Sequence, residues 1–308
     1  MKALTATADD RVITFAEVAE PAPAAGQAVI AVDAFSVNRG DFFALTGVYG
    51  TDPEPGHIPG QDVTGRILQA AADGSGPAAG TRVIAHAAGG GWAERVAVTT
   101  DAIAELPEGL PATAAATLPL AGLTALRLIR RAGDLNGKRL LITGATGGVG
   151  HLVVELALAT GATVTAVTAT RERGQRLADF GARIITEIDE TAGQFDLIME
   201  SVGGDTFTAA LARLVPGGTV IWFGQAGREP IRLDFFALFG VTPFTLHHFP
   251  HWVSDRTDAE DLAELVRLAA TGVIHPELGR TADWAETATV LTDLVGRRIR
   301  GNAALTIA

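Results

Sequence analysis

The segment Leu140-Leu-Ile-Thr-Gly-Ala-Thr-Gly-Gly-Val-Gly150 restricts the possible folds of this chain more than any other part of its sequence. Three apolar residues lead into a turn of small residues, and residues 151–160 then have the apolar spacing of a buried helix. The turn follows the spacing G-x-G-x-x-G, with Ala145 at the first position and Gly147 and Gly150 at the other two. Between a strand and a helix, this spacing predicts that the turn binds a dinucleotide.

The residues Gly147, Gly148 and Val149 would contact the pyrophosphate of such a ligand through their main chain. Their N–H groups stand at a helix N-terminus, where the helix dipole favours a negative charge. Gly150 would allow the helix to pack closely against the strand. A tight turn without any ligand is the alternative for the glycines alone, and the flanking strand and helix favour the cofactor.

The composition excludes several classes of protein. The chain has 308 residues, which is more than one hydrophobic core usually serves, so we expect two domains. No apolar run is long enough to cross a membrane, and the first residues lead into a strand-like segment rather than a signal peptide, so a cytoplasmic enzyme is expected. The formal charge of −11 argues against nucleic-acid binding. Without cysteine, the chain has no disulfide, no thiolate nucleophile and no cysteine-ligated zinc.

The order of the predicted elements indicates an α/β protein with two domains. Short β-type segments separated by glycine and proline turns fill residues 1–110 and predict a partly open β-barrel. Over residues 138–249, strands and helices alternate, which predicts a doubly wound parallel sheet with its ligand at the carboxyl ends of the strands. We expect the tail to return to the barrel, so that residues 1–113 and 252–308 form the first domain and residues 114–251 the second. The strands expected in this sheet are 139–143, 163–168, 183–185, 196–200 and 219–223, and the helices are 148–160, 171–180 and 206–214.

Seven short motifs occur along the chain in a fixed order. They are Val37-Asn-Arg-Gly-Asp41, Thr46-Gly-Val-Tyr49, Ile58-Pro-Gly-Gln-Asp-Val-Thr-Gly65, Gly91-Trp-Ala-Glu94, Leu120-Ala-Gly-Leu-Thr-Ala125, Gly144-Ala-Thr-Gly-Gly-Val-Gly150 and Ser201-Val-Gly-Gly204. Together they resemble the medium-chain dehydrogenase/reductase superfamily, in its zinc-free quinone oxidoreductase and enoyl reductase branch. The resemblance covers nearly the whole chain and implies a GroES-like catalytic domain combined with a Rossmann domain.

The resemblance also bears on metal binding. Zinc-dependent relatives have a cysteine near the position of Asn38 and a histidine in a Gly-His-Glu motif, where this chain has Gly60-Gln61-Asp62. A tetrahedral catalytic zinc would lack its thiolate and imidazole ligands here, so we expect catalysis without a metal.

The residues after the second strand of the sheet favour NADPH over NADH. NAD-preferring folds hold the ribose with an acidic residue about 20 residues past the glycines, whereas this chain has Thr168-Ala-Thr170 there, followed by Arg171 and Arg173. Cationic donors suit a 2′-phosphate, and in the resembling family a basic residue matching Arg173 takes this role. The alternative is an exposed helix start in which both arginines pair with Glu172. Further cofactor contacts implied by the resemblance are Thr124, Ala145, Val202, Phe223 and Gly224, although Thr124 could equally be an ordinary helix residue.

Catalysis without zinc requires hydrogen-bond donors for the charge that develops on the substrate's carbonyl oxygen. Tyr49 is the only tyrosine of the chain and lies in a glycine-flanked loop. Asn38 and Tyr49 match the spacing of an asparagine and a tyrosine in mitochondrial-type enoyl thioester reductases. The match implies that the phenol binds the substrate carbonyl or delivers the proton. The alternatives are that Tyr49 packs its ring in the loop and that Asn38 stabilises a turn.

The expected substrate pocket contains Phe43, Gln61, His248 and Phe249. Phe43 stands where quinone reductases often have a tyrosine, which makes the pocket less polar on that side. Gln61 could face the pocket or satisfy its own loop. The segment 242–252 contains three histidines among aromatic residues and would form an aromatic wall for a flat substrate or a packed interface strand. Metal binding is not expected there, because a proline interrupts the spacing and no carboxylate is adjacent.

These features predict a zinc-independent, NADPH-dependent reductase that transfers hydride to a small conjugated carbonyl compound, namely a quinone, an enone or an enoyl thioester. One alternative is a non-catalytic, NADPH-binding structural or sensor protein. Another is a pathway-specific reductase of a polyketide-type natural product. We expect a homodimer, because an exposed edge strand in such a sheet is often covered by a second subunit.

Overall fold

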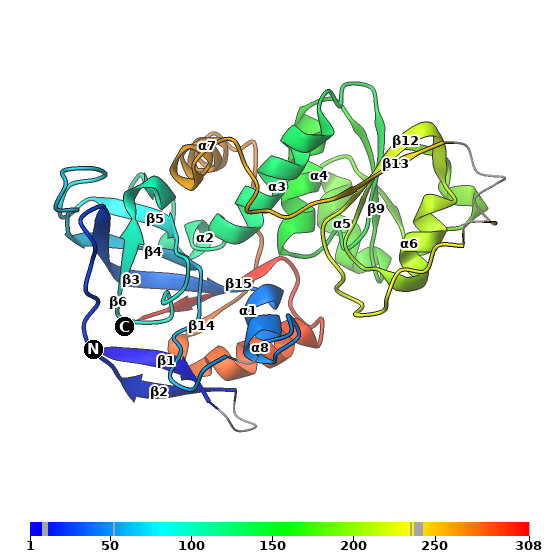
Figure 1. Cartoon of the computed structure of the whole chain (residues 1–308). Helices are drawn as coiled ribbons and strands as arrows, with labels where there is room; N and C mark the ends of the chain where they lie inside the picture. Colours follow the sequence, from blue (N-terminus) through cyan, green and yellow to red (C-terminus); the bar gives the residue numbers. More distant parts are fainter. Residues whose placement is uncertain (8–11, 52, 235, 237–242, 308) are drawn as a thin grey trace. The chain divides into compact units, whose positions relative to one another are not determined.

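The computed structural model describes residues 1–7, 12–51, 53–234, 236 and 243–307. The chain forms two compact units, of which the first comprises Met1–Leu123 with Asp255–Ala308 and the second comprises Thr124–Ser254 (Figure 1). None of the described helices is both long enough and apolar enough to span a membrane.

The first unit is built on a mostly antiparallel sheet of seven strands, in the order β14-β15-β3-β4-β5-β7, with β6 paired to β3. Its strands are β3 (Gln27–Val37), β4 (Asp62–Gln69), β5 (Arg82–His86), β6 (Arg95–Thr99), β7 (Ile103–Glu105), β14 (Leu278–Asp283) and β15 (Asn302–Thr306). A separate antiparallel pair consists of β1 (Lys2–Ala6) and β2 (Ile13–Glu17). β15, from the tail of the chain, pairs with β3, with Ala303 opposite Val37, so the tail belongs to the first unit.

Among the described residues, four helices belong wholly to the first unit, and a fifth begins in it. They are α1 (Arg39–Leu45), α2 (Ala112–Ala115), α7 (Asp258–Ala270) and α8 (Thr287–Val295), with α3 (Pro119–Ala132) continuing into the second unit. Short 3-10 turns occur at η1 (Thr100–Ala102), η2 (Glu190–Ala192) and η4 (Trp284–Glu286). The α2 segment contacts β3, β4 and β15, so the change between units falls after residue 123, not after the expected residue 113. The second change falls after residue 254 instead of residue 251.

The α1 helix was not expected from the sequence, which suggested only a turn at residues 37–41. Asn38 is its N-cap and forms a capping box with Asp41, whose Oδ2 accepts a hydrogen bond from the Asn38 main chain at 2.7 Å. A capping box satisfies main-chain N–H groups that a short helix would otherwise leave unpaired. The helix therefore starts directly after Asn38, one of the two catalytic candidates, and ends before the other, Tyr49.

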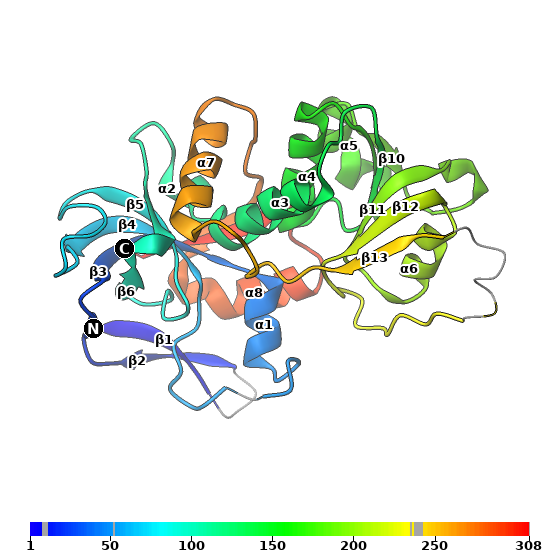
Figure 2. The ribbon, with the colours of Figure 1, turned by 45° about the horizontal axis from the view of Figure 1, so that its top comes forward.

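The second unit contains a parallel six-stranded sheet in the order β10-β9-β8-β11-β12-β13. Its strands are β8 (Arg139–Ile142), β9 (Thr163–Val167), β10 (Arg183–Ile185), β11 (Phe195–Glu200), β12 (Leu214–Trp222) and β13 (Thr245–His248), and its helices are α4 (Gly148–Ala159), α5 (Arg171–Asp179) and α6 (Gly204–Leu211). Counted along the chain, this order is 3-2-1-4-5-6, the order of dinucleotide-binding folds. Figure 2 shows β11, β12 and β13 side by side in this sheet. The predicted doubly wound Rossmann domain is confirmed.

Two predicted elements of the second unit were wrong in their bounds, and one is the strand expected at residues 219–223, which is β12 and already begins at Leu214. The helix expected at residues 206–214 is α6, which ends at Leu211, because Leu214 already pairs with Phe195 as the first residue of β12. Leu141, Ile198, Phe207 and Val220 belong to the hydrophobic core that joins α6 to the sheet.

Candidate cofactor and active site

The glycine turn between β8 and α4 has room for glycine alone at one position. A Cβ atom on Gly150 would lie 2.4 Å from the carbonyl oxygen of Gly144 and 2.7 Å from Cα of Ala145. Both are main-chain atoms, so a side chain would displace the turn. Gly150 thus permits the helix to pack on the turn itself, whereas the sequence predicted close packing of the helix on the strand. Ala145 is completely buried in this packing and supports the turn.

Gly147 is the N-cap of α4, and Gly148 and Val149 follow in its first turn. A Cβ on Gly147 would meet only the carbonyl oxygen of Gly144, at 3.3 Å. The turn therefore leaves the first N–H groups of a twelve-residue helix without a side-chain cap. Main-chain N–H groups at the positive end of a helix dipole form a suitable cradle for a pyrophosphate.

The loop after β9 has the geometry of a helix cap. Thr168 is buried and donates its hydroxyl to the carbonyl oxygen of Thr170 at 2.8 Å. Thr170 is the N-cap of α5, and its Oγ1 accepts from the main-chain N–H of Arg173 at 3.3 Å. Arg171 donates from Nη1 to the carbonyl oxygen of Ile184 at 3.4 Å, which directs its guanidinium to β10. The two threonines thus shape the loop that leads into the first turn of α5, where Arg173 lies.

Three further expected cofactor residues come together where β11 and β12 end. Phe223 donates its main-chain N–H to the carbonyl oxygen of Glu200 at 2.9 Å. A Cβ on Gly224 would lie 3.2 Å from Cβ of Ser201, and Val202 accepts a main-chain hydrogen bond from Gly227 at 2.8 Å. The loop of residues 201–204 and the loop of residues 223–227 therefore lie against each other at the carboxyl edge of the sheet. Thr124 is buried in α3, at the first residue of the same unit.

In the first unit, the buried carboxylate of Asp62 joins three segments that are distant in the sequence. Its Oδ2 accepts from Ser36 Oγ at 2.5 Å and from Asn38 Nδ2 at 2.7 Å, and its Oδ1 accepts from the main-chain N–H of Leu120 at 2.8 Å. His86 is the cross-strand partner of Asp62, and its Nδ1 lies 2.7 Å from Asp258 Oδ2. Sequence reasoning did not select Asp62 as a functional residue, and the motif Gly60-Gln61-Asp62 was the signal that pointed to it.

Asn38 is engaged by this network. Its Nδ2 donates to Ser36 Oγ at 3.1 Å as well as to Asp62, so both N–H donors of the amide already have acceptors. Donation to a substrate would require the amide to give up one of these bonds. Asn38 therefore acts as a support for α1 and Asp62.

Two buried carboxyl groups in this cluster have raised pKa values. Burial raises the pKa of Asp41 to about 7, and the nearby charge of Asp62 adds to the increase. Burial also raises the pKa of Asp62, whereas His86 and the donors Ser36, Asn38 and Leu120 oppose the increase. Since like charges at close range disfavour double ionisation, Asp62 with its three donors holds the negative charge more readily than Asp41.

The pKa of Asp41 leads to an expected pH dependence of stability. Its folded-state pKa of about 7 lies above the ordinary value of 3.8, so its contribution is complete below pH 3.8 and is lost as the pH rises through about 7. Between these values the free energy of unfolding should fall by a few kcal/mol, on the order of one per pH unit. Thermal melting from pH 4 to 8 measures the slope, which Asp41→Asn should flatten. Equal slopes in the two proteins would contradict the assignment.

Tyr49 follows α1 and is the candidate proton donor of this unit. Its side chain is 65% exposed, and its ring meets Phe43 edge to face at 6.0 Å. The hydroxyl lies 3.4 Å from the position that a Cβ on Gly40 would take, beside the start of α1. Partial burial and the charge of Asp41 raise the pKa of the phenol. It therefore stays protonated at neutral pH and can donate a hydrogen bond.

The expected pocket residues are divided between the units. Phe43 and Gln61 belong to the first, where Gln61 accepts a hydrogen bond at its main-chain oxygen from Ala87 at 2.7 Å. His248 and Phe249 belong to the second, where His248 packs at a tilt on Trp222 at 5.8 Å. The segment 242–252 contains strand β13, as its strand interpretation anticipated, and Thr242 lies outside the described residues.

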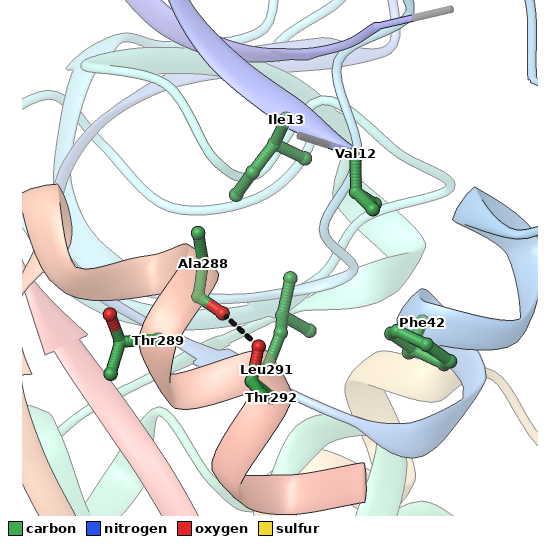
Figure 3. A pocket seen from close by; sticks show the side chains of 7 residues that line it. All are labelled: Val12, Ile13, Phe42, Ala288, Thr289, Leu291 and Thr292. Carbon is green, nitrogen blue, oxygen red and sulfur yellow. Dashed lines mark hydrogen bonds between the residues drawn. The ribbon is translucent and has the colours of Figure 1, made fainter. Parts of the chain in front are cut away.

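A pocket of about 300 Å³ in the first unit contains none of the expected pocket residues (Figure 3). It is lined by Val12, Ile13, Phe42, Ala288, Thr289, Leu291 and Thr292. Thr292 donates its hydroxyl to the carbonyl oxygen of Ala288 at 2.9 Å, within α8. None of the lining side chains is an acid, a base or a cation, so this pocket has no group that suits the reduction of a carbonyl group.

The side chains of the described residues do not fit a metal ion. Across residues 1–7, 12–51, 53–234, 236 and 243–307, no three His, Cys, Asp or Glu residues are grouped so that they could hold one. The chain also has no cysteine. Gln61 stands in the first unit where the zinc-dependent pattern needs an imidazole, so a tetrahedral zinc has no ligand set in this motif.

Comparisons with known proteins agree with this geometry. Residues 148–271 match the family model described as zinc-binding dehydrogenase, and residues 24–108 match the alcohol dehydrogenase GroES-like domain. A quinone oxidoreductase of Pongo abelii is 32% identical, over 74% of this chain and 75% of that protein. An acryloyl-coenzyme A reductase of Sulfurisphaera tokodaii is 27% identical, over 91% of this chain and 92% of that protein. The fold is similar to that of Escherichia coli quinone oxidoreductase complexed with NADPH, at a TM-score of 0.90, 22% identity and 100% coverage of both chains.

The parallel sheet with its glycine turn, together with the mostly antiparallel first unit, defines a two-domain oxidoreductase fold. The chain belongs to the medium-chain dehydrogenase/reductase superfamily, in its zinc-free quinone oxidoreductase branch. The zinc in the name of the matching model does not extend to this chain, because the ligand residues are missing.

Proposed function

We propose that this protein is an NADPH-dependent reductase of small conjugated carbonyl compounds: quinones, enones or enoyl thioesters. The observation that carries the proposal is a dinucleotide-binding turn in a chain whose candidate substrate site offers a phenol and no metal ligand set among the described residues. The names of the relatives support the same reaction class, since quinone and acryloyl-coenzyme A reduction both add hydride to a conjugated system.

Each part of the chain has a separate task in this proposal. The main chain at Gly147, Gly148 and Val149 holds the pyrophosphate, and Arg173 holds the 2′-phosphate. NADPH supplies the hydride when bound. Tyr49 donates a hydrogen bond to the carbonyl oxygen of the substrate, and then gives its proton to the enolate or hydroquinone anion that hydride addition leaves, after which solvent reprotonates the exposed phenol.

The preference for NADPH should depend on Arg173 more than on Arg171. Arg173 stands at the position of the basic residue that the family resemblance implies, in the first turn of α5, and the guanidinium of Arg171 is directed to Ile184. Arg173→Gln should raise the KM for NADPH about tenfold or more and leave the KM for NADH unchanged, because only NADPH has the 2′-phosphate. Arg171→Gln is the matched control, with a smaller effect expected. Equal effects on both cofactors would contradict the role of Arg173.

The reaction itself can be tested by following NADPH oxidation with an enone, an enoyl thioester and a naphthoquinone. Turnover with any of them supports the proposal, and the preferred acceptor identifies the substrate class. NADPH binding without turnover on all three would favour a non-catalytic structural or sensor protein instead.

We also propose a homodimer formed through β13. This strand ends the sheet formed by the described residues, and Leu246 on it is exposed, as are Trp252 and Val253 just beyond it. An uncovered strand edge with apolar side chains favours pairing with a second copy. Leu246→Glu should convert a dimer to a monomer in light scattering, whereas Leu68→Glu, which alters an exposed leucine of β4, should not. A monomeric wild-type protein would contradict the proposal.

A further inference from the structure

Glu200 is a buried acid for which the proposed reaction has no direct use. It is the last residue of β11, next to β8, and its exposed fraction is 0%. A fully buried carboxylate is costly unless hydrogen bonds compensate for the lost water. In this structure the compensation comes from one loop and one neighbouring hydroxyl.

The carboxylate binds two consecutive main-chain N–H groups. Oε1 accepts from Val202 at 2.8 Å and from Gly203 at 3.1 Å, and Oε2 accepts from Gly203 at 3.1 Å. Thr143 donates its hydroxyl to Oε1 at 3.0 Å and accepts from the main-chain N–H of Ser201 at 3.0 Å. Three successive N–H groups of the loop are therefore held by two side chains, Glu200 and Thr143.

The loop that Glu200 holds supports the neighbouring loop in turn. Ser201 and Val202 accept main-chain hydrogen bonds from Ala226 and Gly227, each at 2.8 Å. Gly203, with φ of +84°, makes the sharp turn into α6. The loop that follows β12 is thus hydrogen-bonded to the loop that Glu200 and Thr143 hold.

The position of these loops in the sheet suggests which part of the cofactor they serve. A fold of this strand order consists of two mononucleotide-binding halves that meet where the order reverses, here between β8 and β11. The glycine turn and Arg173 belong to the half with β8, β9 and β10, and the two loops belong to the half with β11, β12 and β13. The adenine end of the cofactor is assigned to the first half by its 2′-phosphate, so the nicotinamide end falls to the second.

We propose that Glu200 is a positioning residue for the nicotinamide half of the cofactor: its carboxylate fixes residues 201–203, and through them residues 224–227, without touching the ligand. The inference rests on the NADPH binding in the proposed function. Burial raises the pKa of Glu200, and the hydrogen bonds from Val202, Gly203 and Thr143 oppose the increase.

The test compares NADPH with adenosine 2′,5′-bisphosphate, which has the adenine end alone. Glu200→Gln places an amide N–H₂ against the N–H of Val202 or Gly203, so we expect the Kd for NADPH to rise about tenfold or more. The Kd for the bisphosphate should stay within about twofold. Calorimetry gives both values, and the fluorescence of bound NADPH reports separately on the nicotinamide ring.

Two further variants separate positioning from general damage. Glu155→Gln is the matched control, because Glu155 is also a buried acid of this unit and lies on α4, where its Oε1 is 3.5 Å from Arg176 Nη2. It should leave both Kd values within about twofold. Thr143→Val should weaken the binding of NADPH but not of the bisphosphate, and Thr143→Ser should restore NADPH binding. This pair of variants tests the positioning role even if Glu200→Gln does not fold.

The inference is overturned if Glu200→Gln weakens the binding of both ligands equally, or of neither. It is also overturned if Thr143→Ser does not restore the NADPH affinity that Thr143→Val loses. A wild-type protein that binds neither ligand would instead remove the proposed function on which the inference rests.

Discussion

Tyr49→Phe should lower kcat for an enone or enoyl thioester by roughly a hundredfold, with little change in the KM for NADPH. The variant keeps the ring that packs on Phe43 and removes only the hydroxyl. General acids typically contribute factors of about 10² to 10⁴ in rate, and Asn38, the other catalytic candidate, already has acceptors for both N–H groups of its amide. Steady-state kinetics with saturating NADPH would measure the effect.

A hydroxyl in the same loop provides the control. Thr46 donates its Oγ1 to the carbonyl oxygen of Phe42 at 2.7 Å, at the end of α1. Thr46→Val therefore also removes one hydroxyl from this segment, and it should reduce stability slightly and leave kcat unchanged. If Tyr49→Phe retains full activity on every substrate that the wild type reduces, the phenol is not the acid.

Gly150→Ala is the second substitution with a large expected effect, because it should reduce both the stability of the second unit and its affinity for NADPH. The new methyl group would stand 2.4 Å from the carbonyl oxygen of Gly144, and no flexible side chain is there to move aside. Overpacking of this kind costs about 1–3 kcal/mol, and the turn that moves is the proposed pyrophosphate site. We expect a lower melting temperature together with an NADPH affinity reduced about tenfold or more.

Gly147→Ala should separate the two properties that Gly150→Ala changes together. The added methyl group would lie 3.3 Å from its nearest neighbour, the carbonyl oxygen of Gly144, and a φ of −86° suits any residue. The melting temperature should therefore stay close to that of the wild type. Affinity for NADPH should still fall, because the methyl group would stand between the main chain and the pyrophosphate. Gly109→Ala, with no atom within 4 Å of its Cβ, is the neutral control. An unchanged NADPH affinity in Gly147→Ala would place the cofactor elsewhere.

Local sequence was sufficient for the second unit because its signals are short-range. A strand, a glycine turn and a helix follow one another within residues 139–159, and alternation of apolar strands with helices continues from there. The turn residues need no distant partner, since the Cβ of Gly150 would collide with atoms only a few residues away. The replacement of an acidic residue by Thr168-Ala-Thr170 can likewise be read along the chain.

The cluster around Asp62 could not be found in this way. Its hydrogen bonds join residues 26 and 58 positions apart, and the contact of His86 with Asp258 spans 172 positions. Such contacts depend on the register of β4 against β5, which pairs Asp62 with His86, and on the start of α7. In the sequence, the motif Gly60-Gln61-Asp62 indicated only that the zinc ligands of related enzymes are replaced. The structure revealed that Asp62 is a buried carboxylate that supports the start of α1.

The same distinction applies to Glu200 and to Asn38. Residues 196–200 were correctly expected as a strand, but alternation and propensity carry no information about which strand end lies beside Thr143, 57 positions away. Asn38 was expected to serve the substrate, and the fold commits its amide to Ser36 and Asp62. Local chemistry thus determined the turn, the helix that follows it and the absence of thiolate ligands. Strand register, which depends on the packing of the whole sheet, decided which polar side chains meet in the interior, because a buried charge persists only where distant segments supply its hydrogen bonds.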